Sequence, residues 1–287
     1  MANTIIVGYD GRAGGRAALE LALRSAELRP GTRIAVVTAD SVGESRQRAL
    51  RAIEAALLEA AEERLAPARQ RLGDRPDTTF EVVRASSPAS ALHRRAEELG
   101  ADLIIVGESH LGTLGRVAAG SITEQTLHAA PCAVAVAPHG YDAETARRKD
   151  LVYGAAYSRS PESEAAVDRA AELARLAGAR LRLINVIGTE LLWYFGQTGA
   201  ETLQTLRDEL AAELRERGAR IEGVEVDVEV VEGDPAAELG RIGEHLDLLV
   251  LGSRGYGPVR RVILGSVSSR AVRHVRCPML VLPRVAD

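Results

Sequence analysis

Cysteines, aromatic residues and long apolar runs are all scarce in this sequence. The two cysteines, Cys132 and Cys277, are too few for a disulfide framework, and their spacing suggests no zinc site. Phe, Trp and Tyr make up 3% of the residues, which disfavours recognition of single-stranded nucleic acid by base stacking. No apolar run approaches the ~18 residues that a membrane-spanning helix needs. A disulfide-rich scaffold and a membrane-spanning protein are therefore excluded.

The chain also lacks a large net charge of either sign: the net charge of its 287 residues is −4. No overall basic field is present to attract nucleic acid or an acidic membrane surface. The cations are almost all arginine, with a single lysine, Lys149. The N-terminus runs straight into a strand-like segment, without the charged and apolar regions of a signal peptide. We therefore expect a soluble cytoplasmic protein with neither a membrane nor a nucleic-acid partner.

The sequence does contain a glycine-rich stretch near its end. Gly252-Ser253-Arg254-Gly255 is followed by nine residues and then by Gly265-Ser266-Val267-Ser268. The stretch begins after the apolar run 248–251, which indicates a buried strand, and it ends where a helical pattern starts. Glycine lets backbone N–H groups approach an anion closely, and a helix N-terminus adds unpaired N–H donors. A strand, a glycine loop and a helix start in this order predict a phosphate-binding site.

Strand-like and helix-like segments alternate along the whole chain. In the first half we expect strands at 4–9, 33–39, 78–83, 102–107 and 133–137, and helices at about 16–28, 45–72, 88–99 and 121–129. In the second half we expect strands at 151–157, 181–187, 224–231, 247–251 and 279–282, and helices at 161–177, about 198–217, 235–245 and from 266 onward. Pro67 is expected to kink or break the long helix that contains it.

The order of elements in the first half recurs in the second. With a constant offset of 145, the matching residues are Asp102, Gly107, Gly120-Ser121, Cys132 and Pro138 with Asp247, Gly252, Gly265-Ser266, Cys277 and Pro283. The repeat predicts two domains, 1–140 and 150–287, joined by a polar linker at 141–149. We expect an α/β fold of two tandem doubly wound, Rossmann-like domains, each with a five-stranded parallel sheet flanked by helices.

The fold rule for such sheets places the ligand outside the carboxyl ends of the strands, where the strand order reverses. Within each half, the turn after the first strand and the loop after the fourth strand both lie at carboxyl ends. Asp10 is in the first kind of turn, and Gly252 begins the second kind of loop. The two places are neighbours in a domain if its first and fourth strands flank the reversal.

The spacing Gly-x2-Gly-x9-Gly-Ser, met by Gly252, Gly255, Gly265 and Ser266, resembles the ATP-binding motif of the universal stress protein family. The opening Ile-Ile-Val-Gly-Tyr-Asp-Gly at 5–11 is similar to that family's first strand and turn. The run at 101–107 and the approach to the last strand at 275–278 are similar to it as well. The likeness covers essentially the whole chain, twice, so the chain resembles a tandem universal stress protein.

The resemblance implies that ATP, or ADP or AMP, lies across the carboxyl edge of the sheet, usually with Mg²⁺. It also implies a pseudo-twofold arrangement of the halves and often a homodimer. In the second half the implied nucleotide contacts are Ala156, Tyr157, Ser158 and Val186 for the nucleoside, and Gly252, Ser253, Arg254, Gly255, Gly265, Ser266, Val267 and Ser268 for the phosphates. In the first half they are Tyr9, Asp10, Val37, Gly107, Gly120, Ser121 and Ile122. No side chain is predicted as a metal ligand.

Each half departs from the family's pattern at one position. The first half keeps Asp10 but has His110 where the second glycine belongs. The second half keeps all three glycines, but an alignment of Ala17-Ala18 with Ala165-Ala166 puts Ser158 in the place of the aspartate. His110 fits a degenerate site, and it also fits a phosphate contact when protonated.

The charges of the two loops differ as well. The loop of the first half carries Glu108, whereas that of the second carries Arg254, Arg260 and Arg261, which also fit a solvated surface. The affinity for a triphosphate depends on close backbone N–H donors and on positive charge. We therefore expect the second half to bind a nucleotide more tightly than the first.

Three functions fit these features. The first is a stress-response or regulatory protein in which ATP occupancy changes conformation or partner choice. The second is a slow ATP-hydrolysing enzyme, which we disfavour because the glycine loop has no lysine and no catalytic set converges on it by spacing. The third is an interaction module with vestigial sites.

Some of the residues singled out also fit purely structural roles. Asp10 also fits a helix cap, and both cysteines fit buried small apolar residues. The segment 193–195 fits packing, an interface or a lid.

Overall fold

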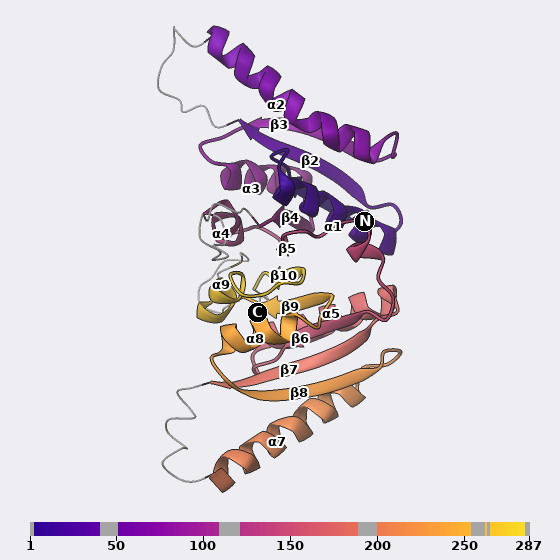
Figure 1. The fold of residues 1–287 in the computed structure, drawn as a ribbon, viewed down its shortest axis with the longest axis vertical. Coiled ribbons are helices and arrows are strands. Elements are labelled where there is room, and N and C mark those ends of the chain that lie inside the picture. The colour runs from indigo at the N-terminus through magenta and orange to yellow at the C-terminus, as the bar shows by residue number, and fades with distance from the viewer. Residues whose placement is uncertain are drawn as a thin grey trace. The chain divides into compact units, whose positions relative to one another are not determined.

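The structure is a computed structural model of the chain, and it describes residues 3–40, 51–108, 121–188, 200–253, 262 and 265–284. The chain divides into two compact units (Figure 1). The first comprises 1–147 with 260–262, and the second comprises 148–259 with 263–287.

The first unit alternates strands and helices. Its elements are β1 (Thr4–Gly8), α1 (Ala13–Leu28), β2 (Arg33–Asp40), α2 (Arg51–Leu72), β3 (Thr78–Arg84), α3 (Pro88–Leu99), β4 (Leu103–Gly107), α4 (Ser121–Leu127) and β5 (Ala133–Ala137), followed by a 3-10 turn at Thr145–Arg147. The strands are parallel in the order β3-β2-β1-β4-β5.

The second unit repeats this pattern. Its elements are β6 (Val152–Ala156), α5 (Pro161–Ala177), β7 (Arg180–Gly188), α7 (Ala200–Ala219), β8 (Val226–Gly233), α8 (Pro235–Gly243), β9 (Leu248–Gly252), α9 (Ser266–Ala271) and β10 (Met279–Leu282). Its strands are parallel in the order β8-β7-β6-β9-β10. The predicted fold class, two tandem α/β domains with a five-stranded parallel sheet in each, is confirmed.

The strand order reverses beside the first strand of each unit. β1 pairs with both β2 and β4, and β6 pairs with both β7 and β9. The first and fourth strands therefore flank the reversal, as the site prediction requires. The turn after β6 and the loop after β9 begin at the same edge of the sheet.

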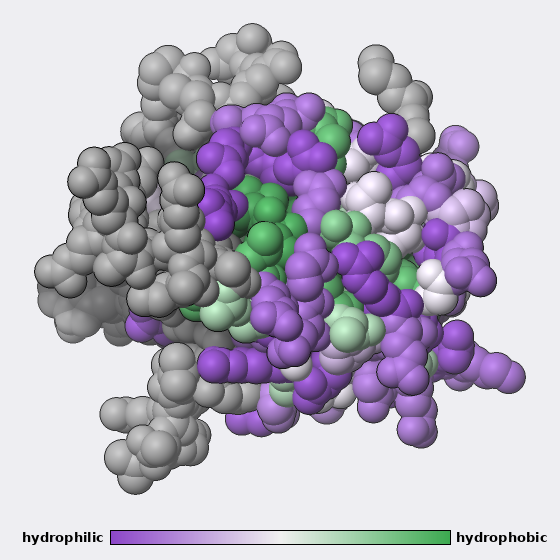
Figure 2. Space-filling view, turned by 90° about the horizontal axis from the view of Figure 1, so that it is seen from above, coloured by the Kyte–Doolittle hydropathy of each residue, from purple (hydrophilic) through white to green (hydrophobic). Residues whose placement is uncertain are grey.

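Consecutive residues of the central strands are buried, which means that both faces of each sheet are covered. Thr4 to Val7 are all buried in β1, and Leu249 to Leu251 are all buried in β9. Because successive side chains point to opposite faces, such a run fits a strand between two layers. On the face drawn in Figure 2 most described side chains are hydrophilic, and the apolar ones form a small group among them. Within the described helices, none combines the length and the apolar character that a bilayer crossing requires.

An aspartate before the fourth strand of each unit holds the start of the first strand. The Asp102 carboxylate accepts a hydrogen bond from the Thr4 N–H at 3.0 Å, and the Asp247 carboxylate accepts one from the Val152 N–H at 2.8 Å. Each bond satisfies a backbone donor at the amino end of a central strand. This shared role explains why the repeat carries an aspartate at both positions.

Helix caps account for the predicted boundaries that match the structure. Ser87 caps α3 and Ser160 caps α5, each through a reciprocal pair with the serine three residues later. Each of these helices begins with proline and is followed by a left-handed glycine, Gly100 or Gly178. The predicted helices at 88–99 and 161–177 are confirmed.

Pro67 was expected to kink or break the long helix that contains it, and the break is wrong. α2 continues through Pro67 to Leu72. A proline inside a helix removes one backbone hydrogen bond. Here Ala61, Leu65, Ala68 and Leu72 are buried along one face, and their packing on both sides of Pro67 offsets that loss. The predicted start of this helix at 45, and the segment 193–195, lie outside the described residues.

Both cysteine thiols are free, and their surroundings keep them protonated. Cys277 is buried and Cys132 is half-buried, and burial raises the pKa of each thiol to about 12. Because the thiolate is the reactive form, we expect iodoacetamide at pH 8 to label Cys277 in the folded protein at least ~100-fold more slowly than in urea. A Cys132→Ser variant isolates the Cys277 signal for mass spectrometry. Rapid stoichiometric labelling of Cys277 in the folded protein would contradict this assignment.

Candidate functional site

A cavity of about 840 Å³ lies at the carboxyl ends of β6, β7 and β9 in the second unit. Many of the residues predicted for the second-half site line it together: Ala156, Tyr157, Ser158, Val186, Gly252, Ser253, Gly265, Val267 and Ser268. The volume lies within the ~300–1,000 Å³ typical of small-molecule sites. The turn, strand and loop positions that the repeat singled out therefore meet around one cavity.

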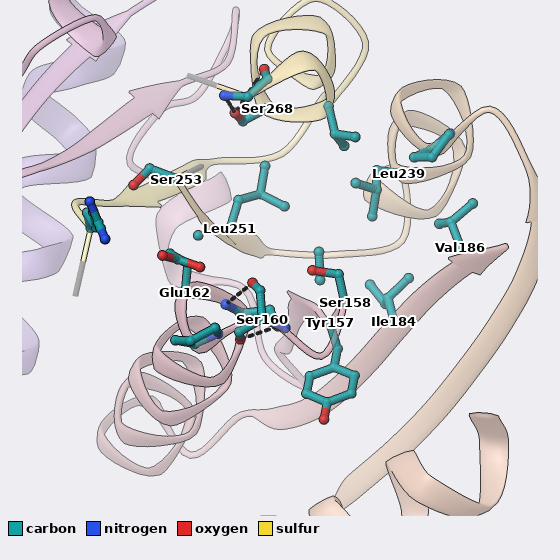
Figure 3. A pocket seen from close by; sticks show the side chains of 18 residues that line it. Tyr157, Ser158, Ser160, Glu162, Ile184, Val186, Leu239, Leu251, Ser253 and Ser268 are labelled. Atoms are coloured by element: carbon teal, nitrogen blue, oxygen red, sulfur yellow. Dashed lines mark hydrogen bonds between the residues drawn. The ribbon is translucent and has the colours of Figure 1, made fainter. Parts of the chain in front are cut away.

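The cavity has an apolar end and a polar end. Ile184 and Val186 from β7 lie beside Leu239 from α8 at one end (Figure 3). Glu162 and Ser253 lie at the other end, near the first glycine of the loop motif. Such a division suits a ligand with a flat apolar part and a charged part.

The turn between β6 and α5 is held in place by hydrogen bonds of Tyr157. Its N–H donates to the Ile184 carbonyl at 2.8 Å, and its carbonyl accepts from Asn185 Nδ2 at 2.9 Å. Its hydroxyl lies 2.9 Å from Glu164 Oε1 and 3.2 Å from Glu213 Oε1. Burial, with these carboxylates, raises the pKa of the Tyr157 phenol to about 12, so the phenol stays a neutral donor. The Tyr157 side chain thus fixes the turn that carries Ser158.

The first turn of α5 packs directly on the end of β9. A Cβ added to Gly252 would lie 2.5 Å from the Glu162 carbonyl oxygen, so only glycine fits at this position. The reciprocal cap between Ser160 and Ser163 fixes the same turn. Gly252 is therefore needed for close packing between a helix and a strand at the polar end of the cavity.

The serines of the glycine loop have different environments. Ser253 is 3% exposed, and its hydroxyl has no hydrogen-bond partner within the described part of the chain. Ser268, by contrast, accepts a hydrogen bond from the Gly265 N–H at 2.9 Å. This bond caps the six-residue helix α9 and occupies the Gly265 amide. The hydroxyl of Ser253, rather than that of Ser268, is left for a ligand.

Of the remaining predicted residues of the second half, the structure describes only Ser266. Ser266 begins α9, while Arg254 and Gly255 lie outside the described residues, as do Arg260 and Arg261.

The first unit arranges the matching turn differently. Tyr9 is 3% exposed, its N–H donates to the Val37 carbonyl at 2.9 Å, and burial raises the pKa of its phenol. The exposed Asp10 carboxylate accepts a hydrogen bond from the Arg12 N–H at 3.0 Å. This bond closes the turn before α1, whereas the N-cap residue of α1 is Arg12 and receives no side-chain cap, so the alternative that Asp10 caps this helix is not borne out.

The end of β4 in the first unit is tightly closed. A Cβ added to Gly107 would lie 1.9 Å from the Gly14 carbonyl oxygen. Glu108, which is 6% exposed, accepts a hydrogen bond from the His139 N–H at 3.1 Å through its carboxylate. Ile122 is 37% exposed on α4. Ser121 begins α4, while Gly120 and His110 lie outside the described residues.

Sequence reasoning missed about half of the cavity. The apolar residues that it did not name are Pro161, Ile184, Pro235, Leu239 and Leu251, and the polar ones include Ser160, Glu162 and Arg284. Pro235 and Leu239 belong to α8, which no motif connects to the glycine loop. For Glu162 the sequence does contain a hint: the alignment of Ala17-Ala18 with Ala165-Ala166 places Glu162 opposite Gly14, so the two halves differ at this position.

Comparison with known proteins shows the family to which the chain is similar. The model of the universal stress protein family matches residues 1–138 and 154–283. A universal stress protein of Mycobacterium tuberculosis (strain H37Rv) is 31% identical over 293 residues, covering 98% of this chain and 99% of that protein. A universal stress protein of Mycolicibacterium smegmatis is 33% identical over 183 residues, covering 63% of this chain and 62% of that protein.

Solved structures share the fold over the whole chain. The crystal structure of a universal stress protein from Archaeoglobus fulgidus has a TM-score of 0.70 at 23% identity, covering 99% of this chain and 100% of that one. A putative universal stress protein from Pseudomonas aeruginosa has a TM-score of 0.63 at 18% identity, covering 98% and 94%. The chain belongs to the universal stress protein family, and the family pattern occurs in it twice.

Proposed function

We propose that the second unit binds an adenine nucleotide, ATP or its products ADP and AMP, and that the protein acts as a nucleotide-binding stress-response or regulatory protein. The observation that carries this proposal is the cavity with one apolar and one polar end at the carboxyl edge of the sheet. Ile184, Val186 and Leu239 offer an apolar surface to a base. Ser253 offers a buried hydroxyl without a described partner to phosphates, and Gly252 lets the first turn of α5 pack beside it at this end of the cavity.

The first unit is the weaker candidate in this proposal. Its buried Glu108 stands where the second unit has Ser253 and already accepts the His139 N–H, so the first unit lacks the Ser253 hydroxyl at this position. Its Asp10 carboxylate is engaged by the Arg12 N–H. We therefore propose one principal nucleotide site per chain. The cytoplasmic location and the homodimer stay predictions.

The test is to identify and count the nucleotide that the protein holds. We expect nucleotide released from denatured protein at no more than about one per chain, and calorimetry with ATP to show one principal site. A Val186→Trp variant fills the apolar end of the cavity and should weaken ATP binding at least ~10-fold, because the base loses its place. An exposed residue of the same unit, Leu176, gives a Leu176→Trp control that should bind normally.

Other outcomes separate the alternatives. Unchanged ATP affinity in Val186→Trp would contradict the site. The absence of any retained or added nucleotide would favour an interaction module with vestigial sites. Turnover of ATP well above background, lost in Val186→Trp but kept in Leu176→Trp, would favour a hydrolase.

A further inference from the structure

The polar end of the cavity holds an unpaired carboxylate. Glu162 lies in the first turn of α5, is 9% exposed and lines the cavity. In Figure 3 its carboxylate extends from α5 toward the strand that carries Leu251 and Ser253. Among the described residues, none forms a hydrogen bond or an ion pair with this carboxylate. A carboxylate in the cavity wall that has no protein partner is available to a bound ligand.

The place of Glu162 is fixed by the glycine motif itself. Its carbonyl oxygen is the atom nearest to the position of a Cβ on Gly252, at 2.5 Å. Ser253, the residue after Gly252, adds a buried hydroxyl that no described residue engages. Two polar side chains from different elements therefore flank the glycine that begins the phosphate-binding motif, and both lack a partner.

At the two corresponding positions, the first unit has different residues. The residue that corresponds to Glu162 is Gly14, and the residue that corresponds to Ser253 is Glu108. The Glu108 carboxylate already accepts the His139 N–H at 3.1 Å. At these positions an unpartnered carboxylate in the cavity wall occurs in the second unit and not in the first, and Glu162 is not part of the glycine motif.

A carboxylate beside a polyphosphate either repels it or shares a cation with it. Free ATP brings three to four negative charges, and a like charge close by in a partly buried site opposes binding. Mg²⁺ prefers oxygen ligands and is commonly bound by one or two carboxylates together with substrate phosphates. Among the described residues, no three His, Cys, Asp or Glu side chains gather into a metal site. Within the described part of the chain, Glu162 is thus a single carboxylate ligand, and the phosphates of the nucleotide and water are the natural source of further oxygen ligands.

We propose that Glu162 makes the second unit selective for the metal-bound form of adenosine di- and triphosphates, because its carboxylate shares a divalent cation with the phosphates. The inference rests on the proposed nucleotide site. Adenosine, which brings neither charge nor metal, is insensitive to Glu162.

The test compares Glu162→Gln with the wild-type chain by calorimetry, using ATP with Mg²⁺, ATP with EDTA, and adenosine. We expect wild-type protein to bind ATP at least ~10-fold more tightly with Mg²⁺ than with EDTA, and Glu162→Gln to reduce this ratio to less than ~3-fold. Glutamine keeps the shape but removes the charge, so affinity should rise in EDTA and fall with Mg²⁺. Mg²⁺ alone should produce no binding signal.

Controls distinguish this inference from the site on which it rests. Glu172 lies on the same helix and does not line the cavity, so Glu172→Gln should keep the wild-type ratio. Equal adenosine affinity in all three proteins supports the site and shows that each variant is folded. A Mg²⁺-to-EDTA ratio that persists in Glu162→Gln overturns the role of Glu162 and leaves the site intact. Failure of wild-type protein to bind either adenosine or ATP overturns the proposed function together with this inference.

Discussion

Replacing Gly252 with alanine is expected to abolish nucleotide binding by the second unit and to lower its free energy of unfolding by about 3 kcal/mol. The added methyl would lie 2.5 Å from the carbonyl oxygen and 2.6 Å from the carbonyl carbon of Glu162. Both atoms belong to the backbone of the first turn of α5, so no side-chain rotation relieves the contact. The turn must move away from β9, and the polar end of the cavity moves with it. Urea unfolding measures the first effect, and calorimetry with ATP measures the second.

The matched control is Gly188→Ala in the same unit. Gly188 ends β7 as Gly252 ends β9, and no atom lies within 4 Å of its added Cβ. This variant should unfold at nearly the wild-type urea concentration. If Gly252→Ala and Gly188→Ala bind ATP equally well, then close packing at Gly252 does not shape the site.

Replacing Gly107 with alanine in the first unit is expected to have a still larger effect on stability. The added methyl would lie 1.9 Å from the oxygen, 2.3 Å from the carbonyl carbon and 2.6 Å from the Cα of Gly14. Gly14 has no side chain, so the whole conflict is between backbone atoms of α1 and β4. We expect the free energy of unfolding to fall by more than about 3 kcal/mol, seen as an early urea transition or as insoluble protein.

A second glycine of the first unit separates this clash from backbone strain. Gly73 has φ +54° and nothing within 4 Å of an added Cβ, so alanine there is strained but not crowded. Gly73→Ala should cost only about 1 kcal/mol. Equal loss of stability in the Gly73 and Gly107 variants would show that the contact with Gly14 relaxes freely.

The fold was largely predictable because its signals are local. Apolar runs such as 248–251 indicate buried strands, and Ser-Pro pairs such as Ser160-Pro161 start helices wherever they are followed by an amphipathic pattern. Helix ends were less certain, and α8 ends at Gly243 rather than near 245. The continuation of α2 past Pro67 depends on packing against β2 and β3, which the local sequence does not reveal.

The site was predictable only where a motif marks it. The glycine spacing led to Gly252 and Gly265, and the first-strand turn led to Ser158. Leu239 reaches the cavity because α8 packs near the end of β7, a relation of tertiary structure that carries no local signal. Ser268, which was expected to face phosphates, lines the cavity, and its contact with phosphate stays a prediction. The motif did not reveal that its hydroxyl accepts the Gly265 N–H at the start of a short helix, where the first amides need a partner.

The pairing of β1 with β4 has a consequence for synthesis on the ribosome. The hydrogen bond between Thr4 and Asp102 joins residues 98 positions apart, and the one between Val152 and Asp247 joins residues 95 apart. The nascent chain must therefore expose most of a unit before its central strand gains the second neighbour. Until then β1, with the sequence Thr-Ile-Ile-Val-Gly, is an unprotected apolar edge. During synthesis of each molecule, an apolar strand edge is therefore exposed twice in succession, once for each unit.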